Sequence, residues 1–574
     1  ALRRDVRRAR EQADVVVLLL HAGQEYAAEV TPEQRRLAHA AVEAGADLVI
    51  GHHTHTTLET ERYLNGLIAY GLGDFVFDID IVDAARDGAL LRVVLGREGV
   101  VRADWIPTRI VDDVQPRPLA APGGRVAVTP LLVRPTEPLP PPPSPRPTYV
   151  LSATVEAGGT VRVEQEIGFP NTTGDTLEEM ALFVFPNAYT GTFFLQEVQV
   201  VQKGVASLPS YALAGPALRL FLPQRLPPGE AVTATLAYTL SLPTVDEHTW
   251  PPQAVLGKSA DGQVLQLGHW YPQLVPYRKG YGWQTWEYHP VGDPFVSDLA
   301  DYRVQVQGPA GYAVWGSGEQ ERDGERFRFR LEAGRDFALF LARDYAESRG
   351  EVDGTTVISA YRREHEAAGQ AVLGIVQQGL ALFRQRYGPY PYPTFTVVEG
   401  EMDAGMEYST LALVGRRFYA DYAGKPASVL PALTAHELAH QWWYGVVGND
   451  QVYEPWLDEA LARYSELLFY EAVYPEAVGW WWETRVDRRN PSGPLDRSIY
   501  DFTDPNTYVN SLYGQGARFL RDLRERLGEE GFLTFLQRYY RENAWQRATR
   551  RTFFRLLDEL GADVSDLVRL YFQR

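Results

Sequence analysis

Two histidines set one helical turn apart are the first residues of this sequence that could do chemistry. His436 and His440 flank Glu437 in the pattern His-Glu-x-x-His. Positions i and i+4 of a helix share one face, so both imidazoles can reach a single cation. An isolated pair of this kind is more often two half-buried core histidines, but here Glu459 follows His440 by nineteen positions. That offset lets a following antiparallel helix return a carboxylate to the same cation, so the sequence predicts a metal site with three ligands.

These ligands need helices to position them, and helical periodicity dominates the sequence after Arg363. By contrast, the run from about Tyr149 to Ala342 consists of short alternating segments separated by Gly, Pro, Asn and Asp, which predicts a β-sandwich or saddle. The predicted helical stretches are Gln370–Tyr387, Ser428–Tyr444, Trp456–Tyr470, Gln515–Arg526 and Arg551–Leu560.

The first hundred residues show a third pattern, in which short apolar runs surround a helical stretch that begins after Thr31-Pro32. This alternation predicts an α/β fold. The strand-like runs are Asp14–Leu20, Asp47–Ile50 and Leu67–Tyr70.

A proline-rich run marks the clearest domain boundary. Eight of the thirteen residues from Pro135 to Pro147 are proline, which removes backbone donors and fixes φ. The run therefore predicts an extended, semi-rigid linker.

Composition excludes several classes of protein. The 574 residues carry a formal net charge of −18, which would repel a polyphosphate backbone, so we expect no nucleic-acid partner. Because the sequence has no cysteine, any metal must be held by His, Asp or Glu. The longest aliphatic run, Val15–Leu20, is too short to span a membrane, and the sequence does not indicate an oligomeric state. Since residue 1 is Ala, we expect the natural N-terminus to lie upstream.

The residues of the predicted metal site resemble the signature of the gluzincin aminopeptidases, the family of aminopeptidase N and leukotriene hydrolase. That signature is His-Glu-x-x-His, eighteen further residues and a Glu, in a Trp-Leu-Asn/Asp-Glu context that is present here as Trp456 to Glu459. The resemblance extends from about Tyr149 to Arg574 and includes the segment His269-Trp270-Tyr271-Pro272, which is similar to the β-domain of bacterial members. Two further motifs are similar: Ala404-Gly405-Met406-Glu407-Tyr408 upstream, and Tyr513-Gly514-Gln515-Gly516-Ala517 downstream.

The resemblance implies one catalytic Zn²⁺ held by His436, His440 and Glu459. Glu437 would be the general base that takes a proton from the attacking water and returns it to the leaving amine. Tyr513 would donate to the oxyanion of the tetrahedral intermediate.

The upstream motif implies how a substrate is bound. Glu407, on what should be an edge strand, would bind the free α-ammonium group of a peptide, with Ala404, Gly405 and Met406 beside it. Ala404 stands where many members have Gly, and Gln515 stands where they have Lys, so these two departures could retune substrate binding.

Two of these assignments have alternatives in the sequence. Tyr508 competes with Tyr513 as the oxyanion donor, and a helix-packing tyrosine is the alternative to both. Glu466, two turns after Glu459, would either hydrogen-bond a metal-bound imidazole or be a solvated surface charge.

The first hundred residues carry histidines of their own. His21-Ala22-Gly23-Gln24-Glu25-Tyr26 and Gly51-His52-His53-Thr54-His55 resemble the poly-γ-glutamate-synthesis (capsule) protein family, whose fold is that of calcineurin-like metallophosphoesterases. The resemblance implies His21, His53 and His55 as ligands of a second divalent metal. The other half of a two-metal site would come from residues nearer the N-terminus than the sequence given, so we expect this half-site to be inactive.

Together these features predict a multidomain chain: a partial α/β metallophosphoesterase-like segment, an all-β domain, and a mainly α, thermolysin-like catalytic domain with a short helical tail. The predicted boundaries are 1–112 for the capsule-type segment, 113–148 for the Pro-rich linker, 149–345 for the β-sandwich or saddle and 346–574 for the peptidase domain.

The predicted function is hydrolysis of the N-terminal peptide bond of peptides with a free N-terminus by a zinc aminopeptidase. The alternatives are an endopeptidase or epoxide hydrolase on the same scaffold, and a non-catalytic envelope-associated module linked to capsule or poly-γ-glutamate synthesis. The capsule resemblance and the linker favour an extracytoplasmic location at the cell envelope, although an acidic chain without cysteine also suits the cytoplasm.

Overall fold

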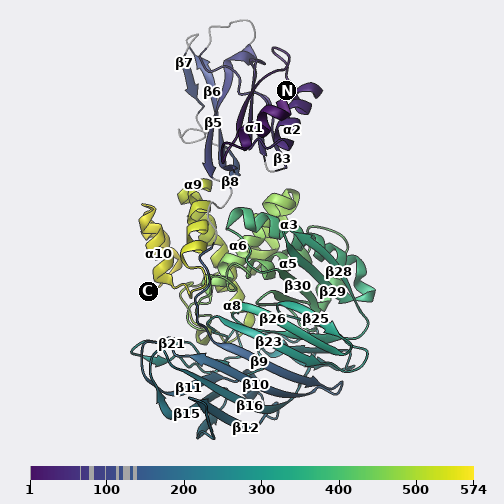
Figure 1. Ribbon diagram of the computed structural model, residues 1–574, viewed down its shortest axis with the longest axis vertical. Helices are drawn as coiled ribbons and strands as arrows, with labels where there is room; N and C mark the ends of the chain where they lie inside the picture. The colour runs from purple at the N-terminus through teal and green to yellow at the C-terminus, as the bar shows by residue number, and fades with distance from the viewer. Residues whose placement is uncertain are drawn as a thin grey trace. The chain divides into compact units, whose positions relative to one another are not determined.

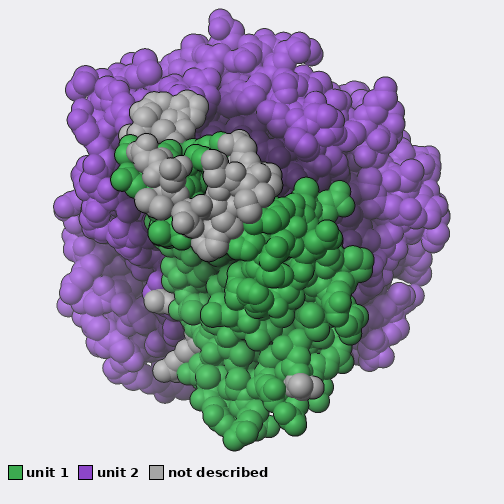
Figure 2. All heavy atoms as spheres, turned by 90° about the horizontal axis from the view of Figure 1, so that it is seen from above, with its two compact units in different colours: residues 1–138 green, residues 139–574 purple. Residues whose placement is uncertain are grey.

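The structure is a computed structural model that divides into two compact units, residues 1–138 and residues 139–574 (Figure 2). It describes residues 2–64, 66–76, 83–96, 99–111, 115–119, 129–133 and 139–573. Part of the linker predicted over 113–148 lies outside these described residues.

The first unit begins with an α/β layer, as the sequence predicts. Its sheet has the order β1-β2-β4-β3, in which β1, β2 and β4 are parallel and β3 is antiparallel to β4. Helix α2 starts with a capping box formed by Thr31 and Gln34. The elements are α1 (Leu2–Arg10), β1 (Val17–His21), α2 (Pro32–Glu43), β2 (Leu48–His52), β3 (Thr60–Tyr63) and β4 (Gly66–Ala69).

A second, antiparallel sheet follows in the same unit. Strand β6 (Gly99–Val111) pairs with β5 (Asp87–Gly96), β7 (Gln115–Pro118) and β8 (Thr129–Val133). Strands β7 and β8 lie within the segment predicted as a linker, which therefore contains ordered strands. Both are edge strands, where proline is tolerated, so proline content alone did not separate linker from strand.

The second unit begins with the predicted β-rich part. Exposed and buried residues alternate along its strands, for example along β9 and β10, because one face of the sheet covers the core. The large sheet has the order β13-β12-β16-β10-β9-β23-β26-β25 (Figure 1). Its strands are β9 (Thr148–Val155), β10 (Thr160–Pro170), β12 (Phe193–Gln202), β13 (Val205–Ser207), β16 (Ala231–Ser241), β23 (Ala300–Gln307), β25 (Glu319–Asp323) and β26 (Arg326–Gly334).

Three smaller sheets complete the β-rich part, with the orders β14-β15-β11-β20, β17-β18-β19-β27-β24 and β21-β22. Their strands are β11 (Leu177–Phe183), β14 (Tyr211–Ala214), β15 (Ala217–Leu226), β17 (Thr244–Val245), β18 (Leu256–Ser259), β19 (Val264–Leu267), β20 (Gln273–Leu274), β21 (Tyr277–Arg278), β22 (Gly282–Trp283), β24 (Ala313–Gly316) and β27 (Leu339–Ala342).

The part predicted as mainly helical also contains a sheet, of order β28-β29-β30-β32-β31. Its inner strands are buried on both faces, so they lack the alternation that reveals a strand in a sequence. Strand β31, which carries Glu407, lies at the edge. Helices α3 and α5 pack on the sheet (Figure 1). The strands are β28 (Tyr345–Val352), β29 (Thr355–Arg362), β30 (Thr394–Gly400), β31 (Gly405–Tyr408) and β32 (Leu411–Gly415).

The helical part and the β-rich part of the second unit share one hydrophobic core. One continuous hydrophobic cluster runs from Tyr149 to Phe572, so the segments predicted as separate domains on either side of residue 345 form one body. Among the described residues, no helix is long and apolar enough to cross a membrane. The helices are α3 (Glu366–Arg386), α4 (Arg416–Ala420), α5 (Val429–Ala439), α6 (Trp456–Val473), α7 (Val478–Trp481), α8 (Pro505–Val509), α9 (Gln515–Glu542), α10 (Arg550–Glu559) and α11 (Ser565–Tyr571).

Candidate functional site

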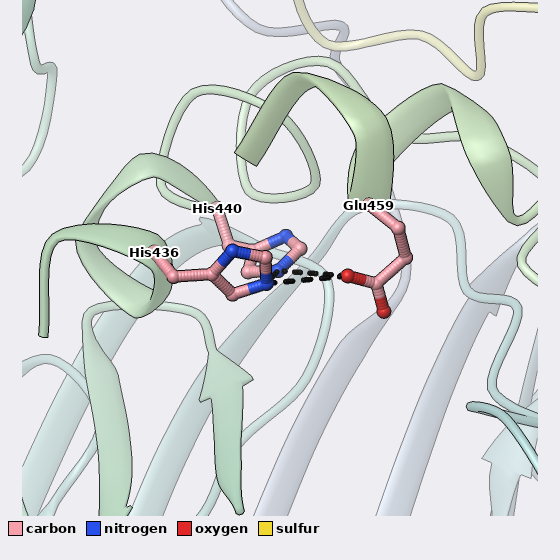
Figure 3. Close-up of side chains that lie close together, drawn as sticks. All are labelled: His436, His440 and Glu459. Carbon is pink, nitrogen blue, oxygen red and sulfur yellow. Dashed lines mark hydrogen bonds and ion pairs between the residues drawn. The ribbon is translucent and has the colours of Figure 1, made fainter. Parts of the chain in front are cut away.

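Three side chains that can bind a metal converge between α5 and α6 (Figure 3). His436 lies in the last turn of α5, His440 is the residue that caps its C-terminal end, and Glu459 lies in the first turn of α6. Nε2 of His436 is 3.2 Å from Nε2 of His440 and 3.2 Å from Oε2 of Glu459. Nε2 of His440 is 3.6 Å from the same oxygen. The structure thus brings the three predicted metal ligands together.

This donor set fits a zinc ion. Two imidazole nitrogens and one carboxylate oxygen are the ligands that catalytic zinc sites use, with the fourth position left for water or substrate. The three side chains are buried, and α5 is buried all round from Leu430 to Ala439. Burial of a carboxylate against two imidazole lone pairs is costly without a cation between them, so the packing itself favours an ion here.

The Nδ1 atom of each imidazole, on the side away from the shared centre, contacts an oxygen atom. Nδ1 of His436 lies 3.0 Å from Oε1 of Glu466, and Nδ1 of His440 lies 3.1 Å from the carbonyl oxygen of Trp443. These contacts turn Nε2 of each ring toward the shared centre, which is how outer partners orient metal-binding histidines.

Glu466 is part of a buried ion-pair cluster, so the alternative of a solvated surface charge is wrong. It pairs with Arg463 and Arg485 at 2.8 Å each and accepts a hydrogen bond from Nε1 of Trp481 at 2.9 Å. Burial opposes its charge, but the two guanidinium groups hold the pKa of Glu466 well below its usual range. An ionised Glu466 can therefore polarise the His436 imidazole.

A cavity opens beside the three clustered side chains, and Glu437 lies in its wall. The cavity has a volume of about 60 Å³. It is narrow at Gly405, because a side chain in place of this glycine would bring its Cβ atom to 2.0 Å from Oε1 of Glu437. Burial, together with the charge of Glu407, raises the pKa of Glu437 above its usual range. The lining residues are Trp250, Pro251, Gly292, Asp293, Ala404, Gly405, Glu407, His436, Glu437, His440, Glu459, Pro505, Tyr508, Val509 and Tyr513.

Glu407 reaches the cavity from the edge strand β31. Alternation along the strand turns Gly405 and Glu407 to the cavity and Met406 to the hydrophobic core, while Ala404 lines the cavity just before the strand. Glu407 is 3% exposed and accepts a 2.9 Å hydrogen bond from Nε2 of Gln451. The carboxylates of Glu407 and Glu437 and the imidazole of His440 lie within 4.8 Å of one another.

Both candidate tyrosines line the cavity, but their contacts differ. Tyr513 is in a short π-helical turn before α9, and its ring stacks on His436 with centroids 5.5 Å apart. Burial, together with the charge of Glu459, raises the pKa of Tyr513 well above its usual value. The hydroxyl group of Tyr508 has no hydrogen-bond partner among the described residues.

Sequence reasoning missed two residues at this site. Asp293 lies on the loop after β22 and lines the same cavity as Glu459. Gln451 lies on the loop between α5 and α6. A lone Asp or Gln on a loop carries no periodic signal, so neither could be identified without the fold. Gln515, one of the two departures, lines a different cavity and donates to the carbonyl of Gly493 at 3.4 Å.

In the first unit the parallel pairing of β1 and β2 brings their terminal histidines together. Nδ1 of His21 lies 2.8 Å from Nδ1 of His52, a histidine that was not predicted as a metal ligand. The ring centroids of His21 and His53 are 4.5 Å apart. His55 is turned toward Asp74, at 2.9 Å. The groups of three or more potential metal ligands found among the described residues include none of these histidines.

Comparison with known proteins finds a different relationship for each unit. Residues 372–571 match the family model described as "Peptidase family M1 domain", and residues 1–79 match the model described as "Bacterial capsule synthesis protein PGA_cap".

Individual relatives share short stretches of sequence. "Aminopeptidase M1-B" of Oryza sativa subsp. japonica is 28% identical over 243 residues, 39% of this chain and 27% of that protein. "PGA biosynthesis protein CapA" of Bacillus subtilis is 41% identical over 102 residues, 18% of this chain and 27% of that protein. The chain thus spans about a quarter of the length of the curated relatives it matches.

Solved structures show the same fold over a longer stretch. A crystal structure of an M1 zinc metallopeptidase from Deinococcus radiodurans covers 75% of this chain and 93% of its own, with a TM-score of 0.53 and 18% sequence identity. A two-domain M1 zinc metallopeptidase bound to L-tryptophan covers 74% of this chain and 94% of its own, with a TM-score of 0.54 and 18% identity.

Proposed function

We propose that the M1 peptidase domain of this chain, together with the β-rich part that shares its core, is a zinc-dependent aminopeptidase. The observation that carries the proposal is the convergence of the His436, His440 and Glu459 ligand atoms beside Glu437 and Glu407 in one buried cavity. The M1 aminopeptidase relatives and the zinc metallopeptidase structures support it.

His436, His440 and Glu459 would hold the zinc ion, which supplies Lewis acidity that lowers the pKa of a bound water. Glu437 stands in the cavity wall with Oε2 free of hydrogen bonds among the described residues, so it can accept that proton and pass it to the leaving amine. The phenol of Tyr513 is the donor for the developing oxyanion.

Glu407 supports cleavage at the N-terminus in particular. A buried carboxylate on an edge strand, in the same cavity as the general base, can bind the substrate's α-ammonium group through a charge-assisted hydrogen bond. That contact places the first peptide bond at the metal. An endopeptidase would need open space where the substrate chain continues past this point, and the buried carboxylate of Glu407 occupies the cavity wall there.

The test is a panel of aminoacyl fluorogenic amides, each paired with its N-acetylated form. We expect turnover of the free amines that is lost with a chelator and in Glu437→Gln, and strongly weakened in Glu407→Ala. Zinc bound at one ion per chain without turnover of any free amine would defeat the proposal. Equal cleavage of the acetylated substrates would favour the endopeptidase instead.

For the first unit we propose a location at the cell envelope, supported by the match of residues 1–79 to capsule synthesis proteins. Fractionation of producing cells tests this, and recovery of the chain wholly with cytoplasmic markers would contradict it. We expect no metal-dependent hydrolysis of an aryl phosphate by this chain, because His21, His53 and His55 belong to none of the groups of three or more potential metal ligands found among the described residues.

A further inference from the structure

Gln451 donates hydrogen bonds to two buried carboxylates, of which one, Glu407, lines the cavity. The residue is 2% exposed and lies on the loop between α5 and α6. Its Nε2 donates to Oε1 of Glu407 at 2.9 Å and to Oδ2 of Asp458 at 2.7 Å. A carboxamide nitrogen has two hydrogens, so both are used. Gln451 therefore links the edge strand β31 to the first turn of α6, next to Glu459.

The orientation of this amide is fixed by its surroundings. The reverse orientation would place Oε1 against two carboxylates, which is repulsive. Asp458 is held independently, because Nδ2 of Asn449 donates to its Oδ1 at 2.9 Å. Gln451 is thus anchored at Asp458 and directs its second N–H group at Glu407.

Within the described part of the chain, Gln451 is the side chain that donates to Glu407. It engages Oε1 and leaves Oε2 for a ligand. A neutral donor orients the carboxylate and leaves its charge uncompensated. An arginine or lysine in the same place would neutralise that charge. A cation in the cavity would therefore meet a carboxyl group that Gln451 orients and does not neutralise.

We propose that Gln451 is a positioning residue that aims Glu407 at the α-ammonium group of the substrate, and so helps to set cleavage one residue from the N-terminus. This inference rests on the function proposed above. Gln451 does not contact the three metal-ligand side chains. We therefore expect it to affect recognition of the free amine and not binding of the metal.

The first experiment measures steady-state kinetics of Gln451→Met on aminoacyl amides. Methionine has a similar length and no donor. We expect KM to rise about tenfold while kcat changes less than about threefold, because a contact that orients the ground-state ammonium is lost. Asn449→Leu is the matched control: it removes a donor from the same Asp458 without touching Glu407, and its KM should stay near that of the wild type.

Gln451→Asn is a second variant that keeps the buried amide on a shorter side chain, and it should also raise KM. The zinc content of all three variants should match the wild type, and all three should remain folded at the assay temperature. The inference is overturned if Gln451→Met lowers kcat and zinc content with KM unchanged, or if Asn449→Leu raises KM as much.

A binding arm separates this inference from the proposed function. In a Glu437→Gln background, calorimetry compares L-alaninamide with N-acetyl-L-alaninamide. We expect the free amine to bind better, and Gln451→Met to reduce that preference about tenfold. A preference fully retained in Gln451→Met would overturn the role of Gln451 alone. Equal binding of the two probes by Glu437→Gln itself would overturn the proposed function as well.

Discussion

The guanidinium group of Arg335 donates from Nε to the carbonyl oxygen of Tyr444 over 2.6 Å. Its Nη2 donates to the carbonyls of Val446 and Gln546, at 3.2 and 2.9 Å. Arg335 follows β26 in the β-rich part, and Tyr444 lies four residues after His440. A buried side chain from the β-rich part of the fold thus fixes the loop that follows α5 in the helical part.

Replacement of Arg335 should destabilise the second unit. Arg335→Met leaves several buried carbonyl groups without their donor, and we expect a loss of about 3 kcal/mol in the free energy of unfolding. Chemical denaturation measures this. Arg343→Met is the control, because Arg343 is exposed and its side chain donates a hydrogen bond to one backbone carbonyl, that of Ala310. A loss in Arg343→Met as large as in Arg335→Met would contradict the prediction.

Neutralising Glu466 should weaken metal binding. Glu466→Gln removes the charge behind His436 and leaves Arg463 and Arg485 without their buried partner, so zinc affinity should fall about 10- to 100-fold. Competition with a chromophoric chelator measures this. Glu471→Gln, on the same helix and paired with Arg524 near the surface, should leave the affinity unchanged. Equal affinities of wild type and Glu466→Gln would refute the role.

Replacement of Tyr513 should lower kcat more than replacement of Tyr508. Tyr513→Phe removes the hydroxyl group from the ring that stacks on His436, and we expect kcat to fall about 100-fold with little change in KM, as for loss of an oxyanion donor. Tyr508→Phe is the matched change on the neighbouring ring and should cost less than tenfold. A larger loss of kcat in Tyr508→Phe would assign the oxyanion role to Tyr508.

Asp336 should make stability depend on pH. Burial raises the pKa of Asp336 from its ordinary 3.8 to about 6, although hydrogen bonds from Tyr444 and Ser409 oppose the rise. Between these two pH values the folded state holds a proton that the unfolded state has lost, so stability falls as pH rises through the window. Asp336→Asn cannot ionise, so its stability relative to wild type should increase by up to about 3 kcal/mol between pH 4 and pH 7. Denaturation curves over this range measure it, and parallel pH profiles of the two proteins would contradict the assignment.

The sequence predicted the metal site better than its surroundings. His436, His440 and Glu459 could be found because helical spacing converts sequence distance into spatial distance. Asp293 and Gln451 could not, since loops carry no such rule. Asp293 lines the cavity and Gln451 contacts Glu407 because of how their loops pack, which is a tertiary property.

The same physical limit applies to the fold. Alternating strands such as β9 were predictable because one face meets the core and the other meets solvent. Strands β30 and β32 are buried on both faces and have the apolar character of a core helix in the sequence. The burial of Glu466 was also undetermined, because its neutralising partner Arg485 is nineteen residues away on another element.

The hydrophobic core that continues past residue 345 also constrains how chains of this kind can be assembled in evolution. A gene rearrangement that gave this peptidase half an unrelated β-rich partner would expose apolar surface and remove the donor that Arg335 supplies. A break near residue 138, where the compact units divide, would interrupt no such core. We therefore expect the β-rich and peptidase parts to be inherited together, and residues 1–138 to be the piece that lineages exchange.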